Sequence, residues 1–110
     1  ESRGLGDVYK RQQLINDNNN IIGISIGFIK PWLKNGELRY EYFLDQLCID
    51  NALQGKGLGT YFMREIEQKL KLENINDIIL NTGLSSPAYK FYIKIGFEDM
   101  KEYGFLSKEL

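Results

Sequence analysis

Hydrophobic and small residues alternate along Ile22–Phe28, and this period of two predicts a half-buried β-strand. We expect a shorter strand before it, at residues 13–16. The polar run Asp17–Asn20 then forms the turn between them, because Asn and Asp tolerate a left-handed backbone. The sequence therefore starts with a predicted hairpin.

Pro31 and the Asn35-Gly36 pair are expected to break the chain again. Aromatic and β-branched residues then predict a strong strand at Tyr40–Asp50. A short, continuously apolar run at Ile78–Leu80 is typical of a buried central strand.

A helical pattern follows the second strong strand. Leu58, Phe62, Ile66 and Leu70 recur at intervals of four, which predicts an amphipathic helix over Leu58–Leu72.

A second, shorter helix is predicted after the apolar run. Ser86 is its expected N-cap, Pro87 its first residue, and Gly96 its left-handed end. Its apolar face comprises Ala88, Phe91, Tyr92 and Ile95. We expect two short strands in Phe97–Leu110. This order predicts an α/β (α+β) fold: a mixed, mostly antiparallel sheet with a parallel central pair and packed helices.

Composition narrows the class of protein. The length of 110 residues suits one domain, and 43% hydrophobic with 26% charged residues is typical of a soluble globular chain. The net charge of −1 gives no electrostatic case for nucleic acid or an anionic membrane. No apolar run approaches a membrane span and no signal peptide is visible. The single Cys48 fits a reducing cytoplasm.

Two further features set limits on the chemistry. Residues 1–12 show neither hydrophobic period, so we expect a tail that is non-native, disordered or simply frayed, with the domain at residues 13–110. The sequence has no histidine. That excludes Ser-His-Asp hydrolysis and nearly all zinc sites, so catalysis has to use carboxylates, Tyr, hydroxyls, Cys48 or backbone dipoles.

A glycine-rich loop joins the predicted strand at 40–50 to the predicted helix at 58–72. Glycines let the backbone approach a ligand, and the helix start presents N–H groups and partial positive charge, which together favour a phosphate. A Walker A loop is absent. A dinucleotide fingerprint has the wrong glycine spacing and lacks an acid after the next strand, which ends in Asn81-Thr82. The remaining candidate is the acyl-CoA loop Gln/Arg-x-x-Gly-x-Gly/Ala, matched by Gln54-Gly55-Lys56-Gly57-Leu58-Gly59.

A second block strengthens this match. Residues 85–97 follow the pattern Asn-x-x-Ala-x-x-Leu/Phe-Tyr-x-Lys-x-Gly-Phe at every position except the first, where Ser85 replaces Asn. Through these two blocks the chain resembles the GNAT superfamily of N-acetyltransferases over about residues 13–110. The resemblance implies a GNAT-like fold that lacks the usual N-terminal strand and two helices.

The resemblance also implies the residues that hold acyl-CoA. The end of the strand would offer main-chain groups to the pantetheine arm, and the loop would bind the pyrophosphate through backbone N–H groups. The implied cofactor-binding residues are Leu47, Cys48, Ile49, Gln54, Gly55, Lys56, Gly57, Leu58, Gly59, Thr60, Ser85 and Tyr92. No metal is expected.

The resemblance points to Tyr92 as the general acid near the CoA sulfur, although its helical spacing also suits a core residue. Asp45 and Glu41, four apart on one strand, are candidates for the base. Either could instead hold a water, bind a cationic acceptor or form a solvated edge. Cys48 is expected to be a small buried hydrophobe rather than a nucleophile.

The resulting hypothesis is transfer of an acetyl group from acetyl-CoA, as cosubstrate, to a primary amine by direct attack. The amine would belong to a small molecule or a protein. The alternative is a non-catalytic acyl-CoA-binding module or an inactive fragment. A nucleotide-binding domain of Rossmann type is a more distant competitor. Self-association is plausible because a truncated core would expose apolar surface.

Overall fold

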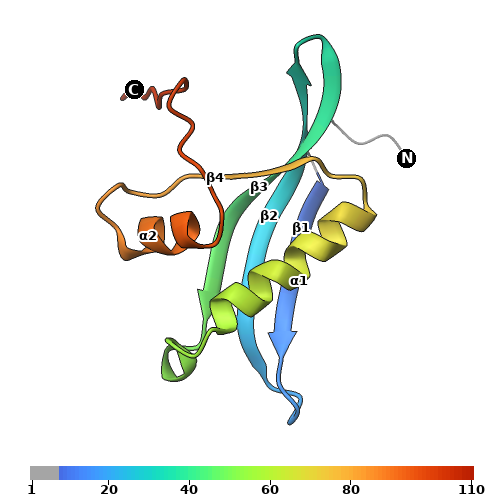
Figure 1. The fold of residues 1–110 in the computed structure, drawn as a ribbon, viewed down its shortest axis with the longest axis vertical. Coiled ribbons are helices and arrows are strands. Elements are labelled where there is room, and N and C mark those ends of the chain that lie inside the picture. The colour runs from blue at the N-terminus through green and yellow to red at the C-terminus, as the bar shows by residue number, and fades with distance from the viewer. Residues whose placement is uncertain (1–7) are drawn as a thin grey trace.

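Three long strands and a short fourth strand form one sheet; as drawn in Figure 1, the longer helix lies in front of the sheet and the shorter helix lies to the side of it. The computed structural model describes residues 8–110. The strand order is β1-β2-β3-β4, antiparallel except for the parallel pair β3–β4, which confirms the predicted mixed sheet. The elements are β1 (Val8–Ile15), β2 (Ile21–Lys34), β3 (Glu37–Ile49), a 3-10 turn (Asn51–Leu53), α1 (Leu58–Leu72), β4 (Asp77–Leu80) and α2 (Pro87–Lys94).

Strand β1 begins at Val8, five residues earlier than predicted. Residues 8–12, assigned above to a tail, pair antiparallel with β2 in continuous register from Val8 opposite Ile29. Pairing with an existing strand supplies the main-chain hydrogen bonds, so a local hydrophobic period is not needed. Residues 1–7 lie outside the described part of the chain, and a non-native origin of the segment stays a prediction.

Strand β2 continues through Pro31, where we expected a break. Pro31 lies opposite Tyr40 of β3. The main chain of Tyr40 is turned the other way: its N–H donates to Asn76 Oδ1 at 3.0 Å and its carbonyl accepts from Asn76 N–H at 2.9 Å. The pairing between β2 and β3 therefore uses no N–H group at position 31, so the proline does not remove a hydrogen bond between these strands.

The two turns of the meander follow the residues that predicted them. Asn35 and Gly36 join β2 to β3 with φ of 52° and 81°, the left-handed conformations that a tight hairpin turn requires. In the β1–β2 turn, Asn19 has φ of 66°, and Asn16 Oδ1 accepts from the N–H groups of Asn18 and Asn20.

Along residues 22–28 of β2, the small residues face the helices and the larger apolar residues face the other way. Gly23, Ser25 and Gly27 are buried, whereas the alternate positions from 22 to 28 are half-buried. The reason lies at Gly27: a Cβ there would stand 2.4 Å from Tyr42 Cζ and 2.5 Å from Tyr42 Oη. The Tyr42 ring occupies that space.

A β-bulge at Asp45 changes which side chains of β3 face α1. Upstream of it, Tyr42 and Leu44 are core residues, and downstream of it Leu47 and Ile49 pack against the same core. The alternation thus slips by one position, because Gln46 pairs with Ile26 and Leu44 with the next residue of β2, leaving Asp45 without a partner.

The core lies between the sheet and α1, and the predicted stripe of that helix supplies half of its buried residues. The buried apolar residues are Tyr42, Leu44, Phe62, Met63, Ile66 and Leu70. From the second helix and its end, Tyr92, Ile95 and Phe97 pack against this cluster. The predicted bounds of α1, the Ser86 cap, Pro87 at the first turn of α2 and the positive φ of Gly96 are confirmed.

Two predictions for the C-terminal half are wrong. β4 is the outer strand of the described sheet and its residues are half-buried, because only β3 flanks it. Residues 98–110 form no strand and are exposed. They contact the rest of the domain through the Tyr103 ring, 6.2 Å from that of Trp32, and through Asp99, which accepts from Tyr89 Oη at 2.6 Å. Among residues 8–110, no helix has the length and apolar character needed to cross a membrane.

Candidate functional site

The downstream end of β3 has one unpaired edge. Its pairing with β4 stops at Leu44 opposite Leu80, immediately before the bulge. The N–H of Asp50 donates to Ile22 of β2 at 2.8 Å, so Asp50 faces β2. By the alternation of an antiparallel ladder, the N–H and C=O groups of Leu47 and Ile49 face the opposite, unpaired edge. An extended ligand could bind these groups as a strand would.

The loop after β3 is built to expose its backbone. Asp50 caps the 3-10 turn by accepting from the N–H of Ala52 at 3.0 Å. Gly55 and Gly57 then adopt φ of 84° and 78°, which favour glycine, and a Cβ at either position would meet nothing within 4 Å. The space beside both glycines is open to a ligand.

The start of α1 supplies free hydrogen-bond donors. Gly57 is its N-cap and has no side chain to cap the helix. The first helical bond runs from Tyr61 N–H to the Gly57 carbonyl at 3.1 Å, so the N–H groups of the preceding turn have no intrahelical acceptor. The helix dipole adds partial positive charge, and the first turn contains no acidic residue to oppose an anion. The loop residues Gln54, Gly55, Lys56 and Gly57 are exposed, and Leu58, Gly59 and Thr60 are half-buried.

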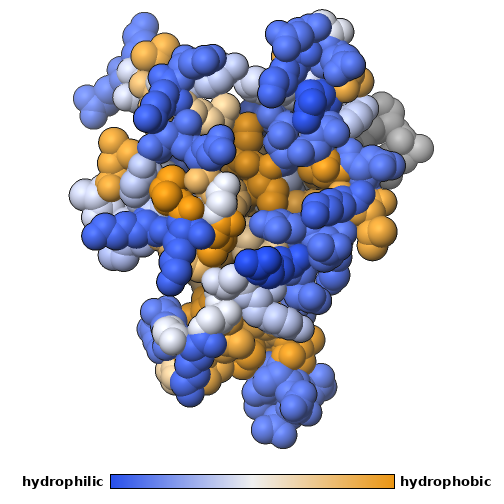
Figure 2. Space-filling model, in the orientation of Figure 1, coloured by the Kyte–Doolittle hydropathy of each residue, from blue (hydrophilic) through white to orange (hydrophobic). Residues whose placement is uncertain are grey.

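Helix α2 lies against the beginning of α1. A Cβ at Gly59 would stand 3.2 Å from Phe91 Cζ, so the absence of a side chain there lets the Phe91 ring approach. This contact positions α2, which contains Tyr92, next to the glycine-rich loop. Figure 2 shows hydrophobic surface between the two helices.

Tyr92 is half-buried between two aromatic rings. Its ring centroid is 5.2 Å from that of Phe91 and 5.2 Å from that of Phe97, both edge to face. Burial raises the pKa of the Tyr92 phenol above 10, and the nearby Cys48 raises it further. The phenol therefore keeps its proton at neutral pH. Its ring packs against the same core as Leu47 and Ile49, at the unpaired end of β3. Ser85, the other candidate from this block, is exposed in the turn before the Ser86 cap.

Cys48 differs from its prediction. It is exposed, not buried. The bulge is the reason: it turns Leu47 and Ile49 toward α1, and the residue between them consequently faces away from the core.

The structure separates the two carboxylates proposed as bases. Asp45 is exposed at the bulge, two positions before Leu47. Glu41 is six positions before Leu47, which is about 20 Å along a strand at roughly 3.3 Å per residue. Asp45 is thus near the unpaired edge, and Glu41 is not.

Glu41 belongs to a separate charged cluster. It is 3% exposed, and its Oε1 has no hydrogen-bond partner in the described structure. Its register neighbours are Lys30 on β2 and Asp77 on β4, and Asp77 forms an ion pair with Arg39 at 3.3 Å. Burial raises the pKa of Glu41, Asp77 raises it further, and Lys30, Arg39 and Lys34 oppose the rise.

The use of the Gln54 side chain was not among the predictions from the sequence. Its amide Nε2 donates to the Ile49 carbonyl at 3.2 Å and to Asn51 Oδ1 at 2.9 Å. The spacing Asn51-x-x-Gln54, with both residues next to a turn, is the signal that could have indicated a local side-chain contact.

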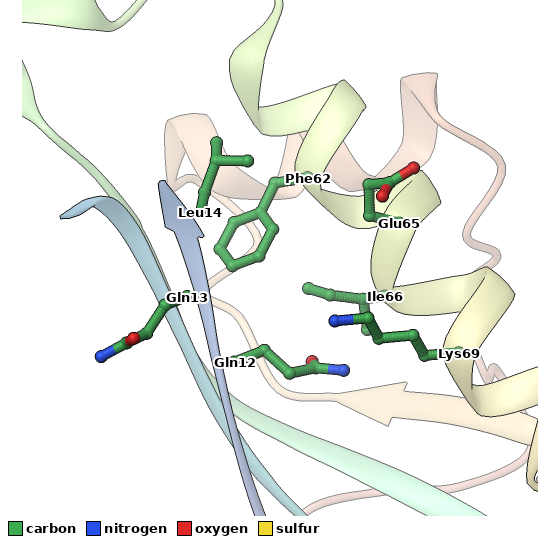
Figure 3. Close-up of a pocket in the computed structure, with 7 residues that line it drawn as sticks. All are labelled: Gln12, Gln13, Leu14, Phe62, Glu65, Ile66 and Lys69. Carbon is green, nitrogen blue, oxygen red and sulfur yellow. The ribbon is translucent and has the colours of Figure 1, made fainter. Parts of the chain in front are cut away.

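A small cavity lies elsewhere, between β1 and α1, as Figure 3 shows. Its volume is about 60 Å³. Its lining residues are Gln12, Gln13, Leu14, Phe62, Glu65, Ile66 and Lys69. It contains none of the predicted site residues. Within residues 8–110, no group of three or more His, Cys, Asp or Glu side chains is arranged to hold a metal ion.

Comparison with solved structures finds the same fold in several proteins, acetyltransferases among them. The BH1408 protein from Bacillus halodurans, in a tetramutant form, superposes with a TM-score of 0.76 at 20% identity, covering 94% of this chain and 68% of that one. A Trypanosoma brucei acetyltransferase gives 0.71 at 18% identity, over 93% and 69%. The aminoglycoside antibiotic 6'-N-acetyltransferase of Acinetobacter haemolyticus gives 0.72 at 18% identity, over 94% and 72%.

The sequence comparison is consistent with the structural one. A search of curated proteins gives no match. A family model described as an acetyltransferase (GNAT) domain matches residues 10–99, which contain the loop, both helices and the unpaired end of β3. Since this match spans most of the chain, the protein belongs to the GNAT acetyltransferase family.

Proposed function

We propose that this chain transfers an acetyl group from acetyl-CoA to a primary amine by direct attack. The observation that carries the proposal is the junction of the unpaired edge of β3 with the uncapped start of α1. An extended amide chain fits the first and a pyrophosphate fits the second. Acetyl-CoA presents both, in that order.

The chain's own groups would divide the work of binding. Main-chain groups of Leu47 and Ile49 hold the pantetheine arm. The N–H groups of the Gly55–Thr60 segment hold the pyrophosphate, with the open space beside Gly55 and Gly57 letting it approach. Lys56, exposed on the same loop, adds a cation next to the phosphates.

The reaction requires two proton movements. The amine nitrogen bonds to the thioester carbonyl carbon and loses a proton, while the carbon–sulfur bond breaks and the sulfur gains one. Tyr92 is the donor to the sulfur, since its raised pKa keeps the phenol protonated and its position is next to the end of β3. A main-chain N–H on the unpaired edge would stabilise the carbonyl oxygen.

For the proton that leaves the amine, position favours Asp45 over Glu41. Asp45 is exposed, so it can accept a proton directly or through one water. Glu41 is buried among charged neighbours and lies about 20 Å from Leu47 along β3. An exposed carboxylate here would also attract a cationic acceptor, which fits a small-molecule or protein amine.

Calorimetric titration of acetyl-CoA into the purified chain is the first test, with NAD and ATP as matched comparisons. We expect acetyl-CoA to bind and the other two to bind at least about tenfold more weakly, a difference of about 1.4 kcal/mol. Release of free CoA thiol with a panel of amines then measures turnover. Binding without turnover for every amine would favour the non-catalytic module, and no binding by the folded chain would contradict the proposal.

A further inference from the structure

Gln54 joins the loop to the end of the strand. Its amide nitrogen donates to the carbonyl of Ile49, the last residue of β3, at 3.2 Å and to Asn51 Oδ1 at 2.9 Å. Among the side-chain hydrogen bonds of residues 8–110, the bond from Gln54 to the Ile49 carbonyl is the one that links the segment Asn51–Gly57 to β3. The remaining bonds of this segment are local, such as Leu53 N–H to the Asp50 carbonyl at 2.9 Å.

The donors of Gln54 are already occupied. A primary amide has two N–H donors, and the two acceptors just named take both. The backbone N–H of Gln54 points to the Asn51 carbonyl at 3.4 Å. In this arrangement Gln54 has no donor to offer a pyrophosphate, which separates it from the glycines that follow it.

The carbonyl that Gln54 contacts is on the unpaired edge of β3. A carbonyl oxygen has two lone pairs, so the Ile49 oxygen can accept from Gln54 and still accept from an extended ligand. The Gln54 side chain therefore fixes the distance between the unpaired edge of β3 and the two left-handed glycines, and it leaves both accessible to a ligand.

We propose that Gln54 is a positioning residue: it braces the loop against β3, so that the pantetheine edge and the pyrophosphate loop are held at the spacing that one acyl-CoA molecule requires. This inference rests on the proposed function. Without the brace, the loop has to be ordered when the ligand binds, and the cost appears in affinity. Once acetyl-CoA is bound, the reacting groups at Tyr92 and the strand end are unaffected, so turnover at saturation should be preserved.

The test compares three variants of the full chain. Gln54→Met keeps the length of the side chain and adds no charge but removes the donors. Gln54→Arg keeps donors at similar reach. Gln68→Met makes the first change at an exposed position of α1, outside the site. We measure the dissociation constant for acetyl-CoA by calorimetry, and KM and kcat by thiol release.

We expect Gln54→Met to raise the dissociation constant and KM about tenfold, the effect of losing one or two hydrogen bonds, with kcat within about threefold of wild type. Gln54→Arg should recover most of the affinity, and Gln68→Met should change nothing. In the ligand-free protein, amide hydrogen exchange of residues 51–57 should be faster in Gln54→Met than in wild type or Gln68→Met.

The failures are distinguishable. If wild type binds acetyl-CoA and Gln54→Met binds equally well, the brace is wrong and the proposed function stands. If Gln54→Arg is as weak as Gln54→Met, or if kcat falls with affinity, the role is not positioning by hydrogen bonds. If wild type does not bind acetyl-CoA, the proposed function fails, and unchanged hydrogen exchange would then contradict the brace as well.

Discussion

The two halves of β3 differ in what surrounds them. From Glu41 to Leu44 the strand pairs on both sides, with β2 and β4, and contains the fully buried Tyr42. From Leu47 to Ile49 it pairs with β2 alone, and the Ile49 carbonyl at its end accepts from Gln54 of the glycine loop. One strand thus contributes its first half to stability and its second half to a binding surface, and the bulge at Asp45 divides them.

The comparison explains why unsatisfied polar groups can occur at the downstream end. A free strand edge and an uncapped helix start each cost stability unless water or a ligand pairs with them. The upstream half, through its packing with α1, holds the downstream half in place. Substitutions in the first half should therefore change unfolding, and substitutions around the second should change binding or turnover.

Truncation in the upstream half should have the largest effect. Replacing Tyr42, 0% exposed, with Ala should lower the free energy of unfolding by about 3–5 kcal/mol, as for other large aromatic core residues. Urea denaturation followed by circular dichroism measures the loss. Tyr40→Ala is the matched control, since Tyr40 is two positions away and 40% exposed. Equal losses for both would contradict the assignment of Tyr42 to the core.

Substitution in the glycine loop should affect binding more than stability. Gly57→Glu places a side chain and a negative charge at the helix start, and should weaken acetyl-CoA binding about 100-fold or more in calorimetry. The left-handed backbone adds a stability cost of about 1–2 kcal/mol.

Gly36→Glu provides the control for that backbone cost. Gly36 has φ of 81°, close to the 78° of Gly57, and open space around it, but it lies in the β2–β3 turn. It should lower stability by a similar amount and leave acetyl-CoA affinity unchanged. A comparable loss of affinity in both variants would mean that the effect at Gly57 is general destabilisation.

Removing the Tyr92 hydroxyl should slow turnover without weakening cosubstrate binding. Tyr92→Phe should lower kcat about 100-fold, the lower end of the range for a general acid, because the departing sulfur loses its proton donor. The acetyl-CoA dissociation constant should stay within about twofold. Tyr89→Phe, in the same helix but with its hydroxyl on Asp99, is the control and should keep wild-type kcat. Unchanged kcat in Tyr92→Phe would assign Tyr92 to the core alone.

The smallest effect should be a pH dependence of stability from Glu41. Burial raises its pKa in the folded chain above the ordinary 4.5. The unfolded state therefore ionises first as pH rises, and stability is lost between 4.5 and the higher folded pKa. Glu41→Gln removes this loss. The free energy of unfolding of the variant, relative to that of wild type, should therefore be higher at pH 7 than at pH 4. Urea denaturation at both values measures this, and a pH-independent difference would contradict it.

The helices and turns were predictable because their signals are local. The i, i+4 stripe of α1, the Ser86-Pro87 start of α2 and the Asn35-Gly36 turn each depend on a few neighbouring residues. The GNAT resemblance identified the loop for the same reason: its glycines and the helix start are contiguous in sequence.

The remaining features depend on partners distant in sequence. Pro31 is tolerated because Asn76 takes the main chain of Tyr40, and residues 8–12 become a strand because β2 is available. The bulge at Asp45 reverses the alternation that sequence reading assumes, which is why Cys48 is exposed. The Gln54 contact with Ile49 likewise needs a three-dimensional loop.

The contact between Gly27 and Tyr42 restricts which variants of this domain can exist. A Cβ at position 27 would stand 2.4 Å from Tyr42 Cζ and 2.5 Å from the Phe43 carbonyl oxygen. The second atom belongs to the main chain of β3, so a smaller side chain at position 42 would remove one clash and leave the other. Among relatives that share this register, position 27 should therefore stay glycine even where position 42 varies, and a pairwise substitution library at these positions should recover folded chains only with glycine at position 27.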